Sequence, residues 1–177
     1  MKKAGVGFML AGLFLVCGCA LFQQKTKGCI SGNCADGTGV YVWKDGSSYQ
    51  GPFKKGAMHG KGIYYWIDGR TYSGDYREGK MQGKGTMTWP DGRAYSGDFK
   101  DNEMTGTGEF KYEDGKIYRG DFVKGQAEGK GVLLWPDGKK YEGDFKDNTM
   151  HGIGRITYPD GSAPVEGKFI NGIHVEK

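Results

Sequence analysis

The chain has 177 residues, of which 34 are glycine, and hydrophobic residues make up 37% of it. This glycine content is well above ordinary usage and argues against the core of a conventional globular enzyme. Aromatic residues make up 14%, too many for a disordered chain. The net charge of +4 is not gathered into any long basic run, which argues against nucleic-acid binding.

The N-terminal segment, 1–18, has the features of a secretory signal peptide. Lys2 and Lys3 give a basic start, and the apolar run 5–16 follows them. Small residues then precede the expected cleavage point. The apolar run is too short to predict a stable membrane-spanning helix, so residues 1–18 are expected to be a leader that is removed.

The end of this leader, Val16-Cys17-Gly18-Cys19, resembles a bacterial lipobox. In that motif the cysteine after a small residue is lipidated and becomes the first residue of the mature chain. The resemblance implies lipidation at Cys19, whereas Cys17 does not fit because Val16 before it is too large. Lipid chains would anchor the protein, since each buried methylene contributes about 0.8 kcal/mol. An ordinarily cleaved signal peptide without lipid is the alternative.

Residues 19–25 would then form the lipidated N-terminus and a short linker. Ala20 stands where Asp in Gram-negative lipoproteins resembles an inner-membrane retention signal. The expected location is therefore the bacterial cell envelope, with the outer membrane favoured if the host is Gram-negative.

Two cysteines follow Cys19, namely Cys29 and Cys34. An oxidising compartment would allow them to form a local disulfide that clips the first repeat. Their spacing lacks the second Cys or His pair of a metal site, so no metal is expected here. Free thiols remain the alternative to the disulfide.

A repeated unit organises the rest of the chain. It is most easily seen in five evenly spaced tyrosines: Tyr49, Tyr72, Tyr95, Tyr118 and Tyr141. A glycine stands at the second position after each tyrosine, and an aromatic residue at the fourth. Gly-x-Gly, another aromatic residue and Asp-Gly complete each unit. Self-similarity at such a period predicts a stacked repeat architecture.

The same frame extends in both directions. Backwards, Gly28 and Ile30 match it, with Thr26 in the tyrosine position. Forwards, the pattern is recovered after a shift of one residue, with Val165 in the tyrosine position. The sequence thus predicts a repeat domain over residues 26–177. Its six units begin near residues 26, 49, 72, 95, 118 and 141, and a terminal half-unit follows them.

The spacing of two within each unit predicts β-strands, because alternate residues share one face of a strand. A turn within 77–82 would join the two strands of one unit, and Asp-Gly would make a tight turn with positive φ between units. The expected fold is all-β, an elongated and curled single antiparallel sheet of stacked 23-residue β-hairpins. Since a lone hairpin is unstable, stacking must supply the core.

One face of the sheet should be aromatic and the other polar. The aromatic face of one unit is expected to hold Tyr72, Gly74, Tyr76, Gly83, Gly85, Met87 and Trp89. Glycines on this face would leave room for neighbouring rings to lie flat on the backbone. They would also permit the curl that shelters rings in a sheet without a second layer.

The unit, in the form Y-x-G-x-F…G-x-G…W-x-D-G, resembles the MORN (membrane occupation and recognition nexus) repeat, and the resemblance covers residues 26–177. It implies an elongated sheet of β-hairpins. Family members serve as scaffolds and dimerisation modules, and some are reported to contact membranes or phosphoinositides. The resemblance therefore implies protein partners or self-association, with contact to lipid head groups as a further option. It implies no catalytic activity and no cofactor.

The aromatic face is the candidate interaction surface. Its residues are Tyr72, Tyr76, Trp89, Tyr95, Phe99, Tyr112, Tyr118, Phe122, Trp135, Tyr141 and Phe145. These rings could form the core of the one-layer sheet, or a groove for a partner, or both. The expected function is a non-catalytic scaffold anchored at the membrane. A module that binds lipid or envelope polysaccharide is the alternative, since exposed rings can stack on sugars.

Two sets of polar residues also recur with the repeat. One set is an aspartate column, Asp75, Asp98, Asp121 and Asp144, and a lysine column accompanies it. Members one repeat apart should lie about 9–10 Å from each other, too far to share a metal ion. Charge pairs across strands are the expected role. His59 and His151 share one position of the repeat in distant units, and no nucleophile–His–acid set is visible, so no enzyme is predicted.

Overall fold

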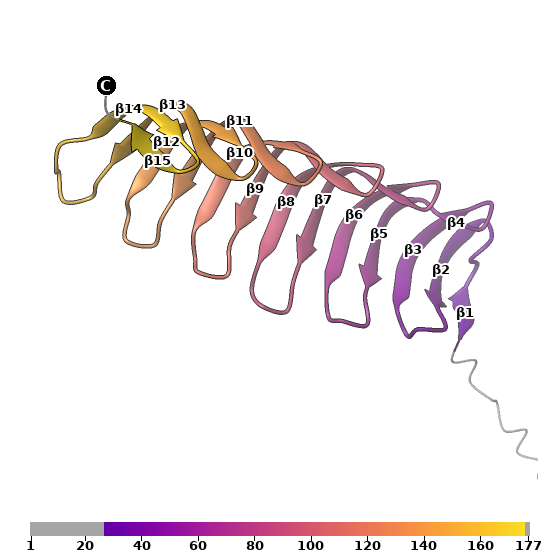
Figure 1. The fold of residues 1–177 in the computed structure, drawn as a ribbon. Coiled ribbons are helices and arrows are strands. Elements are labelled where there is room, and N and C mark those ends of the chain that lie inside the picture. The colour runs from indigo at the N-terminus through magenta and orange to yellow at the C-terminus, as the bar shows by residue number, and fades with distance from the viewer. Residues whose placement is uncertain (1–26, 176–177) are drawn as a thin grey trace, which may run out of the picture.

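The computed structural model describes residues 27–175, which form one antiparallel sheet whose strands follow one another in chain order (Figure 1). The strands are β1 (Gly28–Gly32), β2 (Gly37–Val42), β3 (Ser48–Lys54), β4 (Ala57–Met58), β5 (Gly60–Tyr65), β6 (Thr71–Arg77), β7 (Lys80–Thr88), β8 (Ala94–Lys100), β9 (Glu103–Lys111), β10 (Ile117–Val123), β11 (Gln126–Leu134), β12 (Lys140–Lys146), β13 (Thr149–Thr157), β14 (Val165–Ile170) and β15 (Ile173–Val175). The expected all-β fold of stacked hairpins is confirmed. Within these residues no helix is long and apolar enough to cross a membrane.

Two kinds of turn alternate along the sheet. Inside a unit, Glu78 and Gly79 join β6 to β7 with φ values of 51° and 79°, as a hairpin turn with positive φ at both central positions requires. Between units the chain turns in a short loop that contains Asp-Gly. The backbone N–H of Trp89 donates to the carbonyl of Arg93 at 3.0 Å, and within this loop only Gly92 has positive φ. The Gly92 N–H also donates to the carbonyl of Trp89 at 3.1 Å, so the predicted tight turn with positive φ at Asp-Gly is confirmed.

A β-bulge bends every central hairpin. In β6 and β7, Gly74 pairs with Gly85, but the next residue, Asp75, pairs with Gln82. Gly83 lies in the skipped segment with φ of 62°, and a Cβ placed on it would approach Asp75. Gly83 is therefore part of the bulge. Contrary to expectation, it does not lie on the aromatic face beneath a ring. The bulge changes the direction of the strand beyond it, as bulges do in other sheets.

The core lies inside this bend, on the aromatic face. Tyr72 is fully buried, and its ring covers both glycines of the pair Gly74 and Gly85, where an added Cβ would come within 2.4 Å of the tyrosine oxygen. The Tyr72 hydroxyl donates to the carbonyl of Asp75 at 3.2 Å. Its ring meets Tyr76 and Phe99 edge-on at centroid distances of 5.2 and 4.8 Å, which suits aromatic pairs. The expectation that rings lie on a glycine floor holds.

The same arrangement recurs in each central unit. The tyrosines Tyr49, Tyr72, Tyr95, Tyr118 and Tyr141 have 0% exposure, and each covers a glycine pair. The edge-on rings link each unit to the next, so the core is continuous along the array. This continuity explains how a sheet without a second layer gains enough buried apolar area to fold.

The two ends of the array depart from the frame. At the N-terminal end Tyr41 pairs with Cys29, whereas the repeat frame would pair it with residue 26. The expected match of Gly28 and Ile30 to the frame is therefore wrong. A bulge follows Cys29, and the Cys29 and Cys34 sulfur atoms are 2.06 Å apart in a disulfide. At the C-terminal end, Val165 occupies the tyrosine position opposite Ile156, as the one-residue shift predicts.

Candidate interaction groove

Most of the predicted aromatic surface turns out to be core. Eight of its rings are 5% exposed or less: Tyr72, Tyr76, Tyr95, Phe99, Tyr118, Phe122, Tyr141 and Phe145. Trp89, Tyr112 and Trp135 are the members that stay half-buried and packed against that core. The surface that a partner can reach is therefore narrower than the sequence pattern indicates, and it lies near the Asp-Gly loops.

We call the half-buried rings along this side the aromatic strip. Its members are Tyr41, Trp43, Tyr64, Trp66, Trp89, Phe110, Tyr112 and Trp135. Five of these rings lie outside the predicted set. Tyr41, Tyr64 and Phe110 stand at a strand position that the motif does not include. Trp43 and Trp66 match the motif but belong to the first two units, from which the predicted set takes no residue. The repeat of apolar residues at 41, 64, 87, 110 and 133 could have revealed those on the strands.

The loops hold the indole rings of the strip in place. The guanidinium carbon of Arg93 lies 5.3 Å from the Trp89 ring centroid, and Asp91 binds the same guanidinium at 2.8 Å. Asp91 also accepts the Arg93 backbone N–H, which holds the pKa of its carboxyl below the usual value. Arg70 and Lys139 cover Trp66 and Trp135 at 5.1 and 4.2 Å. The rings are thus presented in fixed orientations, which lowers the entropy cost of binding.

A methionine row faces the strip across the bend. It consists of Met58, Met81, Met104 and Met150, which occupy one position of the repeat. Trp66 from a loop and Met104 from the other arm line the same hollow, so the two arms approach each other on this side. The row was not predicted, although its spacing by whole repeat units is visible in the sequence. Thioether side chains adapt to varied partners, which suits a binding groove.

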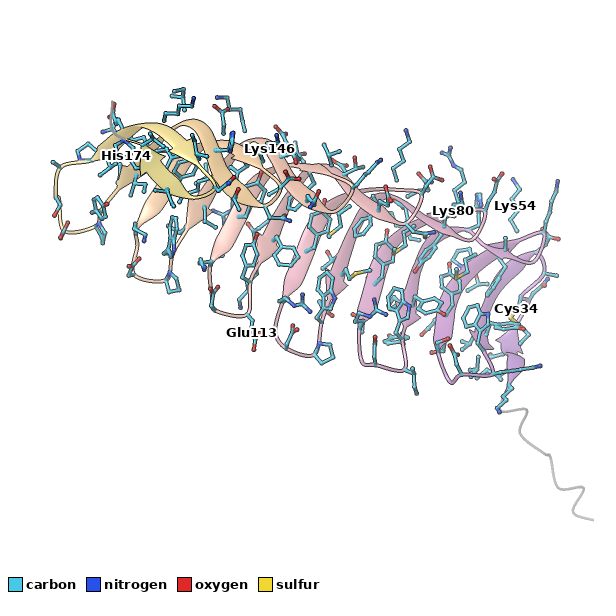
Figure 2. All side chains as sticks on the ribbon, viewed as in Figure 1. Cys34, Lys54, Lys80, Glu113, Lys146 and His174 are labelled. Carbon is cyan, nitrogen blue, oxygen red and sulfur yellow. A yellow bond between two sulfur atoms is a disulfide. The ribbon has the colours of Figure 1, made fainter. Side chains whose placement is uncertain are left out.

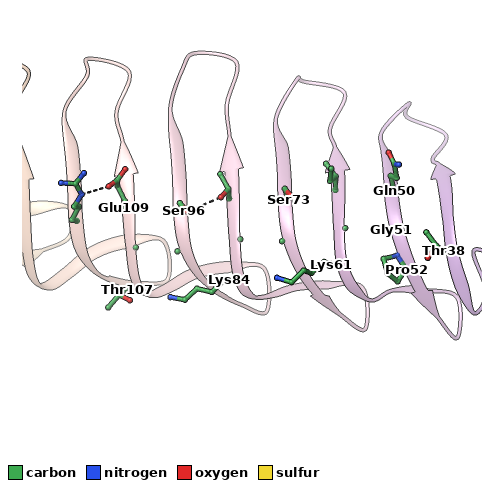
Figure 3. Close-up of a pocket in the computed structure, with 18 of the residues that line it drawn as sticks. Thr38, Gln50, Gly51, Pro52, Lys61, Ser73, Lys84, Ser96, Thr107 and Glu109 are labelled. Carbon is green, nitrogen blue, oxygen red and sulfur yellow. Dashed lines mark hydrogen bonds and ion pairs between the residues drawn. The ribbon is translucent and has the colours of Figure 1, made fainter.

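The polar face has a second groove, over β2 to β10, with glycine backbone as its floor (Figure 3). Its volume is about 1190 Å³. Hydroxyls of Ser73, Thr86 and Ser96 and the ion pair of Arg119 with Glu109 stand along it. Its charged side chains are largely paired and its apolar lining is mostly backbone, so it offers few anchors to a partner.

Three of the four aspartates in the column form the expected charge pairs across strands. Lys61 binds Asp75 at 3.4 Å, Lys84 binds Asp98 at 2.8 Å, and Lys130 binds Asp144 at 2.5 Å. The Lys84 ammonium and the Thr107 backbone N–H hold the pKa of Asp98 below its usual value. The fourth member, Asp121, lies opposite Thr107 in the sheet, and its carboxylate accepts the backbone N–H of Lys130. These pairs are exposed and contribute only tenths of a kcal/mol each.

The remaining predicted positions that the structure describes, Cys29 and Cys34, lie at the N-terminal end of the array. Cys34 packs against the first unit of the core, and His174 lies at the opposite end of the array (Figure 2). Cys19, the predicted lipidation site, lies outside the described residues. Among residues 27–175 no three metal-ligating side chains come together. On this side the described residues form a hollow lined by rings and thioethers, which is suited to binding apolar side chains.

The family comparison agrees with the hairpin frame. A family model described as MORN repeat matches residues 31–48, 49–69, 72–92, 95–117, 118–140 and 141–163. The first match begins after the first strand has started, where the register departs from the repeat. No match to the chain is found among curated protein sequences.

Three solved structures show partial likeness. The TCP domain of SAS-4 (dCPAP) from Drosophila melanogaster, in complex with a proline-rich motif of Ana2 (dSTIL), is 13% identical with a TM-score of 0.49 over 75% of this chain and 72% of that chain. A mutant TCP10 domain of Danio rerio CPAP is 15% identical, with a TM-score of 0.30 over 75% and 72%. The wild-type domain, in complex with a peptide of Danio rerio STIL, is also 15% identical, with a TM-score of 0.29 over 75% and 68%. At TM-scores below 0.5 this likeness does not bear on what the chain binds.

Proposed function

Because the chain belongs to the MORN repeat family, we propose that it is a non-catalytic scaffold that binds protein partners beside a membrane. MORN repeats are commonly protein-interaction modules. In this proposal the groove between the aromatic strip and the methionine row receives the partner, which is another protein or a second copy. The lipid on Cys19 holds the scaffold at the bacterial cell envelope, at the outer membrane if the host is Gram-negative.

The observation that carries the binding proposal is the aromatic strip itself. The buried tyrosines already supply the core, and the strip places a second series of rings outside it, half-exposed and held by loop cations. Rigid aromatic side chains with one face still open are the usual anchors of protein interfaces. A strip needed only for stability would not require its rings to remain accessible.

The anchor would keep the array close to the membrane. Only a short linker separates Cys19 from Lys27, where the described chain begins. A chain of that length spans at most about 26–29 Å when fully extended. Gly28 pairs with Val42, next to the Trp43 loop, so the linker would enter at the loop edge that bears the aromatic strip. Partners bound there would be gathered near the membrane surface.

The binding proposal is tested by cross-linking in intact cells followed by affinity purification of the full-length protein. The test variant carries Trp89→Ala and Trp135→Ala, which remove two indoles of the strip. A matched control carries Thr86→Ala and Ser96→Ala, which remove an exposed hydroxyl pair 3.3 Å apart on the polar face. Both variants are first checked for the native circular dichroism spectrum.

A protein partner that is captured by the wild type and the control but lost in the indole variant would support the scaffold. Capture of only lipid or wall fragments, by all three proteins alike, would contradict it and favour an envelope-binding module. Loss of the partner in the polar-face control alone would place the interaction on the opposite face of the sheet.

The anchor is tested separately by metabolic labelling with an alkyne fatty acid. Cys19→Ser should abolish the label and release the protein from the membrane fraction. The neighbouring Cys17→Ser is the matched control and should leave both unchanged, because that residue would be removed with the leader. A label that survives in the Cys19 variant would disprove the assignment of the lipidated residue.

A further inference from the structure

The first strand of the array contributes little to its core. β1 lies at the end of the sheet (Figure 1), and none of its five residues, all of which the structure describes, is buried. A bulge after Cys29 interrupts its register with β2. By contrast, β3 carries the buried rings of Tyr49 and Phe53. Packing therefore gives β1 little local stability of its own.

The Cys29–Cys34 disulfide fastens this strand to the array. It joins β1 to the loop between β1 and β2, and that loop is bound to the first hairpin turn by contacts of its own. The Gly56 N–H donates to the carbonyl of Ala35 at 2.8 Å, and the Asp36 carboxylate accepts a second N–H of the same turn at 3.0 Å. The loop can therefore stay on the array without the disulfide, whereas β1 depends on it.

The two ends of β1 lie at opposite edges of the sheet. At its start Gly28 pairs with Val42, next to the Asp-Gly loop that follows Trp43. At its far end the connecting loop contacts the hairpin turn at Gly56, so this end lies at the edge formed by the hairpin turns, which we call the turn edge. The N-terminal chain thus reaches the array at the loop edge while β1 is bound, and at the turn edge when β1 is detached.

We propose that reduction of the Cys29–Cys34 disulfide detaches β1 and moves the attachment of the membrane tether from the loop edge to the turn edge. The inference rests on the lipid anchor of the proposed function and adds its regulation. The oxidised protein holds the aromatic strip next to the membrane. The reduced protein presents the strip away from the membrane, to partners that the surface would otherwise exclude.

The tether also becomes longer on reduction. From Cys19 to Lys27 the chain spans at most about 26–29 Å, whereas from Cys19 to Asn33 it spans at most about 46–50 Å. The added reach exceeds the length of β1 itself, since five strand residues rise about 17 Å. The array is then free to turn its loop edge outward.

The reaction requires a dithiol from outside the chain. A thiolate of the dithiol attacks one cysteine sulfur, the S–S bond breaks, and the second thiol of the dithiol resolves the mixed disulfide. Two electrons and two protons pass to Cys29 and Cys34, and the dithiol leaves as a disulfide. The residues next to the two cysteines, among them Ile30 and Ala35, are exposed, so a small dithiol can reach the bond.

The first test measures hydrogen exchange of the full chain in detergent, before and after excess dithiothreitol. Alkylation followed by mass spectrometry counts the free thiols. Exchange of β1, and of the β2 amides that pair with it, should rise about thirtyfold, because a cross-link that closes a short loop contributes a factor of this size. β15 is a short edge strand without a cysteine at the other end of the array, so its exchange should not change.

The second test measures which edge faces the membrane. All four tryptophans of the chain, Trp43, Trp66, Trp89 and Trp135, belong to the aromatic strip. The full chain is placed in vesicles of phosphatidylethanolamine and phosphatidylglycerol that contain dansyl-phosphatidylethanolamine. Energy transfer from tryptophan to dansyl should fall about twofold or more when dithiothreitol is added, since the tether is longer and leaves from the far edge.

Two variants check the assignment. The double variant Cys29→Ser and Cys34→Ser should show fast β1 exchange and low energy transfer from the start, without a response to dithiothreitol. Ser31→Ala changes an exposed residue of β1 and keeps the disulfide, so it should behave as the wild type. A disulfide that yields no free thiols, or β1 exchange that rises no more than that of β15, would overturn the proposal.

The two readouts separate this inference from the proposed function. If energy transfer is strong and stays unchanged although the disulfide is reduced, the lipid anchor stands and the inference fails. If energy transfer is absent in both redox states while β1 exchange responds, the lipid anchor fails, the change of tether falls with it, and only the release of β1 remains.

Discussion

The central units and the two ends of the array cover their glycines with different groups. In the centre a buried tyrosine covers each glycine pair, as Tyr95 covers Gly97 and Gly108. At the N-terminal end the sulfur of Cys34 lies over Gly39, 2.8 Å from an added Cβ. At the C-terminal end the imidazole of His174 lies over Gly167 and contacts Phe169 at 5.2 Å.

The difference shows what the repeat requires and what it leaves open. The glycine floor must be covered on its aromatic side, because bare backbone next to the core would be wetted. At the N-terminal end the covering group comes from the loop between β1 and β2, and at the C-terminal end it comes from the last strand, β15. Such local coverings are typical of terminal repeats, which have a neighbour on one side only.

Alkaline pH should unfold the central units completely. Burial raises the pKa of Tyr49, Tyr95 and Tyr141 to about 12, above the unfolded value of 10.0. Stability from these groups is therefore fully present below pH 10 and is lost as the pH rises toward 12. Tyrosinate absorbance and circular dichroism are followed together, and the buried tyrosines should ionise only as the sheet unfolds. Ionisation of all tyrosines near pH 10 with an intact sheet would contradict this.

Gly97→Ala tests the glycine floor of a central unit directly. The new methyl would lie 2.4 Å from the Tyr95 oxygen and 2.7 Å from the backbone of Gly108, so the ring must be displaced. The expected loss of unfolding free energy is about 3 kcal/mol, measured by urea denaturation.

The matched control is Gly92→Ala, in a loop where no atom lies within 4 Å of the new methyl. Its φ of 89° should still cost about 1 kcal/mol. If the two variants lose equal stability, the glycines matter for backbone conformation alone and not as a floor for rings.

The N-terminal end is tested by removing each cysteine in turn. Cys29→Ser and Cys34→Ser both abolish the disulfide, which closes a short loop and contributes about 2 kcal/mol. Cys34→Ser also removes the sulfur over Gly39, so it should cost more than Cys29→Ser. Hydrogen exchange of β1 and β2 should rise in both variants while the central strands stay protected. Equal losses would assign the whole effect to the cross-link.

Much of the fold follows from the sequence because its causes are local. Tyr-x-Gly followed two positions later by Phe or Tyr recurs in the five central units, and it indicates the strands, the shared face and the glycine floor that the array repeats. The bulge at Gly83 was missed because an extra residue in one strand leaves the period unchanged. The register of β1 was missed because the disulfide and its loop override a weak match to the frame.

The candidate site was harder to predict than the fold. The sequence grouped Tyr95 with Trp135 as one aromatic face, yet one is buried and the other is half-exposed. Tyr95 lies inside the bend over its glycine pair, whereas Trp135 lies in a loop between units. The bulge that makes the bend leaves the period of the sequence unchanged, so the pattern does not reveal it.

The smallest effect concerns one ring within the centre. Tyr76 stands where the other units have phenylalanine, and its hydroxyl is buried without a hydrogen-bond partner. Tyr76→Phe should therefore raise the unfolding free energy by about 1 kcal/mol, because a buried hydroxyl without a partner is costly.

Tyr95→Phe removes an equally buried hydroxyl, but one that donates to the carbonyl of Asp98 at 3.0 Å. It should lower the unfolding free energy by about 1 kcal/mol. The two changes in unfolding free energy are measured in parallel urea titrations. If they have opposite signs, the repeat requires only an aromatic ring at such positions, and the hydrogen bond explains why tyrosine is used at Tyr95. If both variants lose unfolding free energy, the Tyr76 hydroxyl has a hydrogen-bond partner, such as a bound water. The core around Tyr76 would then be hydrated.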